Sequence, residues 1–162
     1  WGGAVALSGG TLSGGRVEGN EADGAGGIFS DGGVIRNVVV HNNRTTERYP
    51  AGGISARRTD ILNCTITNNL AILDGGGLDI DECLVTGCTI HDNTAVEKGG
   101  GIMMIGSTVT GCSIFQNTAA EGGGVWVSGA TPESVIGGGT SIYANTPENC
   151  HAERGDVCAG FD

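Results

Sequence analysis

The sequence has few aromatic residues, few prolines and few basic residues. Aromatics make up 4% of its 162 residues, only three residues are proline, and eight Lys or Arg stand against eighteen Asp or Glu. The resulting formal charge of −10 repels phosphate groups and anionic headgroups, so nucleic acid is not expected as a partner. No apolar run approaches the roughly 20 residues that a membrane-spanning helix needs, so membrane insertion is not expected either.

The cysteines and histidines do not form a metal-binding pattern. None of the six cysteines belongs to a CxxC motif, and His41, His91 and His151 are not at the spacing of zinc ligands. We therefore expect no metal, no other cofactor and no catalytic residue. An even number of cysteines in so polar a chain is typical of an oxidising compartment, which predicts an extracellular or cell-surface protein.

Glycine is abundant, and it belongs to a repeat. The hexamers CTITNN at 64–69, CTIHDN at 88–93 and CSIFQN at 112–117 follow one another at intervals of 24 residues. Looser copies stand at 15–20, 38–43 and 140–145. A glycine pair followed by an apolar residue precedes each hexamer, as at 52–54 and 100–102. A repeat of this length indicates a solenoid, a propeller or an array of small units.

The local pattern favours a solenoid of strands. Apolar and polar residues alternate within the hexamer and after the glycines, which is the period of a strand, and a third short apolar stretch lies between them. Three short strands in about 24 residues predict a right-handed, single-stranded parallel β-helix of six or seven coils over residues 1–149. Residues 150–162 are expected to form a cysteine-containing tail or cap.

Each hexamer ends in asparagine, and stacking the coils aligns these residues. An inward asparagine at a bend can replace the backbone hydrogen bonds that the bend removes, so we interpret the column as structural. This asparagine ladder consists of Asn20, Asn43, Asn69, Asn93, Asn117 and Asn145.

The cysteines divide into two groups. Cys150 and Cys158 enclose a short polar segment outside the repeat, and we predict a disulfide between them. Cys64, Cys88 and Cys112 share the inward position of the hexamer and are expected to be free, buried thiols. A disulfide within that stack, or one that uses Cys83, stays open as the alternative.

Two acidic clusters suggest chemistry but have simpler explanations. Asp79, Asp81 and Glu82 align one coil away from Arg57 and Arg58, which suggests either a carbohydrate-active site or ordinary cross-strand charge pairing, and we favour the pairing. Acidic residues also recur before the glycine corners. They are interpreted as solvated turn residues, with calcium binding as the alternative: Asp23, Asp74, Glu97 and Glu121.

Four outward apolar residues predict a contact surface in the C-terminal half: Met103, Phe115, Trp126 and Tyr143. Its partner would be another copy of the chain, a flanking segment of a longer chain, or an extracellular glycan that stacks on the aromatic rings. Asn43 and Asn63 begin glycosylation sequons, and Asn63 is the expected acceptor because Asn43 belongs to the inward ladder.

The glycine pairs and the IxxN end of each hexamer resemble the GGA[ILV] and FxxN repeats of the chlamydial polymorphic outer membrane proteins. Ile or Val stands here in place of Phe, as at Ile66 and Ile114. The resemblance implies a surface-located parallel β-helix and carries over no catalytic residue. We therefore expect a structural or adhesive module, of the kind that forms a subunit or segment of an extracellular fibrous assembly. A polysaccharide lyase or hydrolase, or a glycan-binding module, is the alternative.

Overall fold

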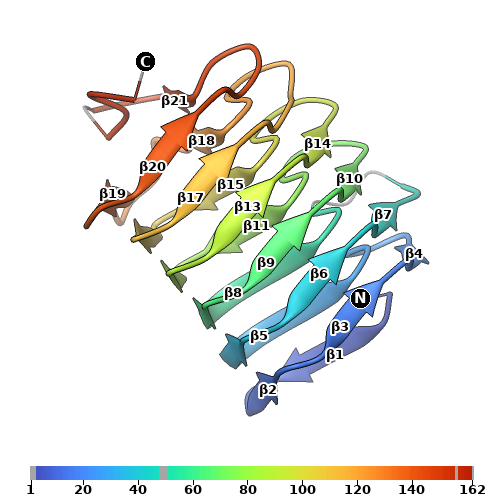
Figure 1. Cartoon of the computed structure of the whole chain (residues 1–162). Coiled ribbons are helices and arrows are strands. Elements are labelled where there is room, and N and C mark those ends of the chain that lie inside the picture. Colours follow the sequence, from blue (N-terminus) through green and yellow to red (C-terminus); the bar gives the residue numbers. More distant parts are fainter. Residues whose placement is uncertain (1–2, 48–50, 156, 162) are drawn as a thin grey trace.

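The chain folds into a stack of parallel coils. The computed structural model describes residues 3–47, 51–155 and 157–161, and these residues form strands and turns without any helix. About six coils follow one another along the axis from the N-terminal to the C-terminal end (Figure 1). Every strand pairing among them is parallel, and each joins residues about one repeat apart. The predicted parallel β-helix is therefore confirmed.

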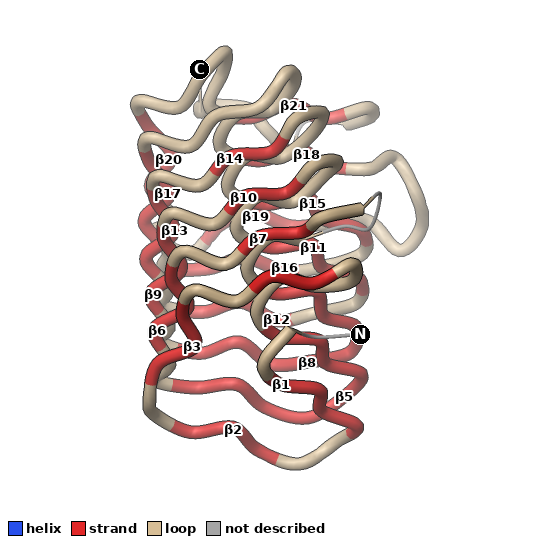
Figure 2. The backbone as a smooth tube through the Cα atoms, turned by 90° about the vertical axis from the view of Figure 1, so that its right-hand side faces the viewer, coloured by secondary structure: helices blue, strands red, loops and turns tan. Residues whose placement is uncertain are grey.

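The largest sheet forms the first wall of the stack. It is one continuous strand per coil in β5 and β8, and elsewhere it is divided at a bend into two shorter strands (Figure 2). Its members are β1 (Val5–Ser8), β2 (Thr11–Ser13), β5 (Ile28–Arg36), β8 (Ile54–Leu62), β11 (Leu78–Asp81), β12 (Leu84–Thr86), β15 (Ile102–Ile105), β16 (Thr108–Thr110), β18 (Val125–Val127), β19 (Val135–Gly137) and β21 (Cys150–Ala152).

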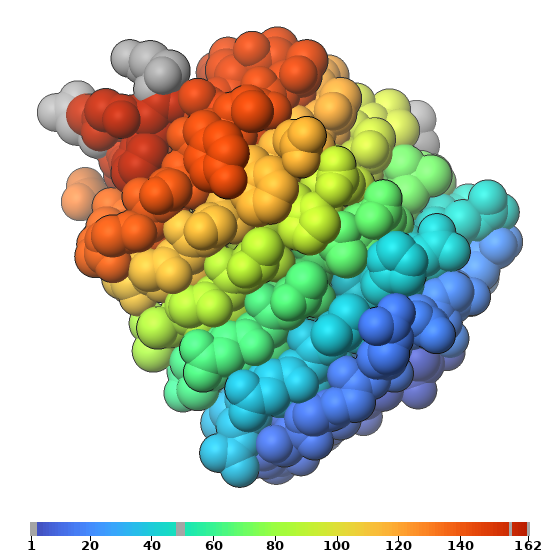
Figure 3. All heavy atoms as spheres, in the orientation of Figure 1, coloured from blue at the N-terminus to red at the C-terminus, as the bar shows by residue number. Residues whose placement is uncertain are grey.

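The hexamers form a second wall, and a pair of residues after each early hexamer forms a short third one. The outer face of the hexamer wall shows the coils as regular parallel rows (Figure 3). Its strands are β3 (Arg16–Glu18), β6 (Val39–His41), β9 (Thr65–Thr67), β13 (Thr89–His91), β17 (Ser113–Phe115) and β20 (Ser141–Tyr143). The third wall contains β4 (Glu21–Ala22), β7 (Arg44–Thr45), β10 (Leu70–Ala71) and β14 (Thr94–Ala95).

The interior is filled by aliphatic side chains in register. Ile66 pairs with Ile90 and Ile90 with Ile114, and all three are fully buried. Burying one such side chain stabilises the fold by roughly 1.5–3 kcal/mol. The hexamer column is continuous through the stack, as the sequence predicted: Val17, Val40, Ile66, Ile90, Ile114 and Ile142.

The asparagine ladder runs beside this column. The Oδ1 atom of Asn93 accepts hydrogen bonds from the backbone N and the Nδ2 atom of Asn69, one coil below, both at 3.0 Å. Nδ2 of Asn69 also donates to the carbonyl of Val40 at 3.0 Å. The same pattern links all six predicted residues, and only Asn20, in the first coil, is half-buried; the others are buried.

The glycine pairs face the ladder. A Cβ atom on Gly77 would lie 3.0 Å from Nδ2 of Asn93 and 2.7 Å from the carbonyl oxygen of Gly101, so any side chain there would collide with both. Gly53 stands in the same relation to Asn69. The two motifs that recur in the sequence therefore contact each other inside every such coil.

The C-terminal boundary lies slightly later than expected. Cys150–Ala152 forms β21, which pairs with β18, so the stack runs three residues past the predicted limit at residue 149. The ladder also ends there, because Oδ1 of Asn149 accepts hydrogen bonds from the backbone N and Nδ2 of Asn145, both at 3.2 Å. A turn residue thus takes the place of the next coil.

The ladder makes a prediction about stability. Replacing Asn93 with Ala removes the acceptor for two buried donors of Asn69, and each unsatisfied buried group costs roughly 1–3 kcal/mol, so we expect a loss of about 3–5 kcal/mol in urea unfolding. Asn20→Ala at the end of the ladder should cost under about 1 kcal/mol, because Asn20 has no coil below it in the described chain. Equal losses of unfolding free energy in the two variants would contradict the claim that the buried hydrogen bonds of the ladder stabilise the fold.

Candidate functional surface

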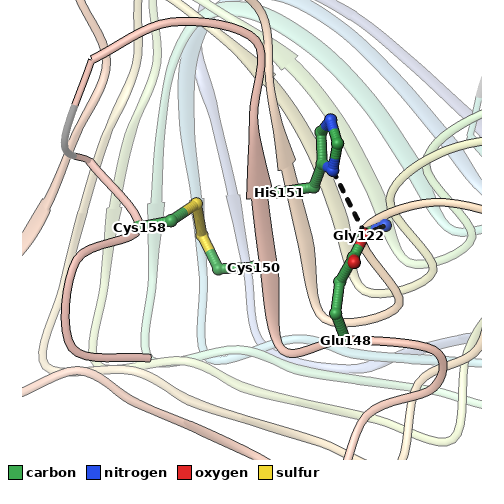
Figure 4. The surroundings of a disulfide bond; sticks show 5 residues. All are labelled: Gly122, Glu148, Cys150, His151 and Cys158. Atoms are coloured by element: carbon green, nitrogen blue, oxygen red, sulfur yellow. Dashed lines mark hydrogen bonds and ion pairs between the residues drawn. A yellow bond between two sulfur atoms is a disulfide. The ribbon is translucent and has the colours of Figure 1, made fainter. Parts of the chain in front are cut away.

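The C-terminal end is covered by a disulfide loop. Cys150 and Cys158 form a disulfide, as predicted, with their Cα atoms 5.4 Å apart. The bond joins the first residue of β21 to the tail that follows this strand (Figure 4). Val157 and Phe161 pack against the end of the core from within this tail. The tail therefore shields apolar groups that the last coil would otherwise present to water.

His151 and Glu148 join this end to the coil below. Nδ1 of His151 lies 3.2 Å from Oε1 of Glu148, which also accepts a hydrogen bond from the backbone N of Gly122 at 2.8 Å (Figure 4). Both side chains are partly exposed. The contact ties the turn before β21 to the preceding glycine corner.

The other four cysteines are buried free thiols. Sγ of Cys88 accepts a hydrogen bond from the backbone N of Cys64 at 3.4 Å, and Sγ of Cys112 does the same for Cys88. The pKa of Cys88 is raised by its hydrogen bonds with Cys112 and Cys64 and by burial, and burial raises that of Cys83 to about 11. Cys83 and Cys88 therefore stay protonated, whereas the side-chain hydrogen bonds with Cys88 lower the pKa of Cys64 to about 7 and lower that of Cys112.

An aromatic column lies on the outer face of the hexamer wall. The rings of His91 and Phe115 stack with centroids 4.9 Å apart, and those of Phe115 and Tyr143 with centroids 5.2 Å apart. Phe115 therefore has both ring faces occupied and is only half-exposed. Tyr143, at the end of the column, is 49% exposed.

Trp126 is not part of an exposed surface, which corrects the sequence prediction. It is 3% exposed and lies between Met103 below and His151 above in register. Nζ of Lys98, from the preceding turn, lies 4.1 Å from the Trp126 ring centroid and covers it. The Nε1 atom of Trp126 is buried without a hydrogen-bond partner in the described part of the chain. Of the four predicted contact residues, Met103 and Phe115 are half-buried and only Tyr143 is well exposed.

The charged cluster on the large sheet is mostly paired. Nε of Arg57 lies 3.2 Å from Oδ2 of Asp81, its register partner one coil above. Arg58 turns the other way and donates from Nη2 to Oδ1 of Asp31, 2.6 Å away, instead of to Glu82. Ordinary cross-strand pairing therefore accounts for both arginines.

Asp79 is the exception in this cluster. It is half-buried between Ser55 and Met103, and no hydrogen bond or ion pair to its carboxyl is found among the described residues. Burial, together with the charges of Asp74 and Asp81, raises its pKa to about 7. Asp74 also has a raised pKa because of burial, while its Oδ1 accepts a hydrogen bond from the backbone N of Lys98 at 3.0 Å.

The acidic turn residues do not converge. Oδ1 of Asp23 accepts a hydrogen bond from the hydroxyl of Thr46 at 2.6 Å. Within residues 3–47, 51–155 and 157–161, no group of three His, Cys, Asp or Glu side chains is placed to hold a metal ion. Nor does this part of the chain contain a helix long and apolar enough to cross a bilayer.

The hollows of the described surface include the following two. One, of about 500 Å³, follows the corner after the first three hexamers, where the Glu21–Arg44 ion pair and the exposed side chains of Asn42 and Asn68 line it. The other, of about 210 Å³, lies between the turn after β18 and the C-terminal tail. Asp79 lines neither of them.

These features define a parallel β-helix with closed hydrogen-bond ladders. Comparison with protein families agrees: residues 2–146 match the model of the right handed beta helix region. The chain belongs to this family, which also confirms the predicted hand of the coil. The finer resemblance to chlamydial polymorphic outer membrane proteins is not part of that match. Searches of curated proteins and of solved structures gave no match.

Asp79 predicts an unusual pH dependence. The ordinary pKa of an aspartate is 3.8, and that of Asp79 in the folded chain is about 7. The group therefore leaves the free energy of unfolding undiminished below pH 3.8 and lowers it as the pH rises through 7. Asp79→Asn should therefore stabilise the protein at pH 8 by roughly 2 kcal/mol, about half of what the full shift implies, because water reaches part of the carboxyl. At pH 3.5 the two proteins should unfold alike in urea.

Asp81→Asn is the matched control for that measurement. It removes a carboxylate two residues away that is already paired with Arg57 and makes the smallest contribution to the raised pKa of Asp79, so it should stabilise the protein at pH 8 much less than Asp79→Asn does. A gain of the same size in both variants would mean that general charge repulsion, and not the environment of Asp79, is responsible.

Proposed function

We propose that this chain is a structural module of an extracellular or cell-surface protein, a stiff spacer with adhesive contacts, and that it is not an enzyme. The observation that carries the proposal is the unbroken asparagine ladder, which links every coil to the next from Asn20 to Asn145 and ends on Asn149. Coils locked to one another in this way resist shear and bending, as a spacer requires.

The location is supported by the disulfide and by the charge. The Cys150–Cys158 bond would be short-lived in the reducing cytosol, and disulfides of this kind persist outside it. The formal charge of −10 keeps the chain soluble and away from nucleic acids. The four remaining thiols are buried and take no part in this argument.

The two ends of the stack differ, and the N-terminal end is the one that favours protein contacts. The C-terminal end carries the disulfide tail and the closed ladder. At the N-terminal end, β1, β2 and β3 pair on one side only within the described chain, and the inward Val5, Leu7 and Leu12 are half-buried. Open strand edges over an incomplete core invite further strands, so we propose that a second copy or a flanking segment meets this end.

Glycan binding is the weaker adhesive route. A sugar ring needs an aromatic face, and both faces of Phe115 are occupied by His91 and Tyr143. The outer face of Tyr143 is the part of the column that is left for such a contact, because β20 is the last strand of its sheet.

Sedimentation velocity tests the attachment end. We expect association of the purified protein to depend on concentration and to be abolished by Leu12→Glu, which places a charge in the first coil. Ile136→Glu is the matched control, because Ile136 is half-buried in the same inward column in the last coil, and it should leave association unchanged. Loss of association in the control alone would place the contact at the C-terminal end and contradict the proposal.

One observation favours the second candidate, a carbohydrate-active enzyme. Asp79 has a carboxyl whose pKa near 7 suits a general acid, and the carboxyl of Asp74 is close enough to raise it further. On our proposal, incubation with acidic and neutral polysaccharides releases no new reducing or unsaturated ends. Product released by the native protein and lost in Asp79→Asn would establish the enzyme instead.

A further inference from the structure

The chain carries two glycosylation sequons, and the fold separates them sharply. They are Asn43-Arg-Thr45 and Asn63-Cys-Thr65, located in successive coils. In N-glycosylation the side-chain amide nitrogen bonds to C1 of an oligosaccharide, loses a proton and displaces a lipid diphosphate as the leaving group. The product must then fold with a bulky polar chain on that nitrogen.

Asn43 does not tolerate such a chain. It is 1% exposed, and its Nδ2 atom donates to the carbonyl of Val17 at 2.9 Å and to Oδ1 of Asn69 at 3.0 Å. Its sequon threonine, Thr45, is 2% exposed and accepts a hydrogen bond from the backbone N of Ile72. A glycan here would break the ladder and open the core, so a chain modified at Asn43 would not complete the fold.

Asn63 has the opposite surroundings. It lies at the corner between β8 and β9, in the left-handed region with φ of 52°, and its side chain is exposed. Its backbone N donates to the carbonyl of Thr86, which fixes the corner. Its side-chain amide takes no hydrogen bond among the described residues, so a glycan on Nδ2 displaces no contact of the fold.

The column above Asn63 leaves room for a sugar. The equivalent positions in the next two coils are Gly87 and Gly111, both in the left-handed region. A Cβ atom on Gly87 would lie 2.5 Å from Oδ1 of Asn63, so the Asn63 side chain lies directly over this glycine. A Cβ atom on Gly111 would meet nothing closer than 3.7 Å. The corner beyond Asn63 is therefore free of side chains for two coils.

We propose that Asn63 is an N-glycosylation site and that Asn43 is not, whenever the chain passes through a secretory pathway that carries a lipid-linked oligosaccharide. The glycan covers the corner between the large sheet and the hexamer wall, two coils above the first coil. A corner that carries a glycan stays in solvent, so the proposed protein contacts are left to the ends of the stack. The inference deepens the proposed extracellular role and shares its premise of secretion.

The test compares the same substitution in the two sequons. The full chain is expressed in a eukaryotic host behind a secretion leader, so that the result does not depend on the native location. We expect the native protein and Thr45→Val to carry one endoglycosidase-sensitive glycan, and Thr65→Val and Asn63→Gln to carry none. Glycopeptide mass spectrometry should place the glycan of the secreted protein on Asn63, and any glycan on Asn43 should be confined to the retained protein.

Reading the retained protein as well keeps the outcome independent of folding. Thr45→Val alters a buried residue and is the variant most prone to misfold, but its sequon occupancy is measured before secretion. A native protein without a glycan, or a glycan that disappears in Thr45→Val and persists in Thr65→Val, would overturn the assignment. The sedimentation experiment on the attachment end is unaffected by either result, so the two proposals fail separately.

Discussion

The fold depends on one contact that every middle coil repeats, in which an asparagine amide lies against a residue with no side chain. Asn93 and Gly77 illustrate it, since a Cβ atom on the glycine would lie 3.0 Å from Nδ2 of the asparagine. The close approach lets that amide reach the coils on both sides. Glycine costs conformational entropy in a strand-rich chain, and the buried hydrogen bonds of the ladder offset that cost.

This contact fixes the register of the coils, and the register decides what lies on the surface. Outward side chains are aligned with the same position one coil away, about 4.8 Å distant, so neighbours in a column are obliged to interact. Arg57 and Asp81 become an ion pair for that reason, and His91, Phe115 and Tyr143 become a stack of rings. Cross-strand pairing therefore explains this ion pair and this ring stack, although the same residues suggest catalysis or ligand binding in the linear sequence.

The sequence predicts whatever the repeat controls. The hexamer column, the asparagine ladder and the parity of the strands follow from the 24-residue spacing, because residues at equal positions must stack. It does not predict contacts made by side chains that reach out of their own position. Lys98 extends from a turn to cover Trp126, and Arg58 turns down to Asp31 instead of up to Glu82. Such choices depend on side-chain length and local charge, which the period does not specify.

The end of the repeat is unpredictable for a related reason. Asn149 completes the ladder from four residues away instead of from the next coil, so the ladder closes on a residue that the spacing does not identify.

Functional residues should be sought where the repeat is broken. Core and ladder positions use the same chemistry in every coil, and only departures from it carry information. The column of Ser55, Asp79 and Met103 contains the clearest departure, because a half-buried carboxyl with no partner among the described residues is expected to lower stability at neutral pH and makes no hydrogen bond of the ladder.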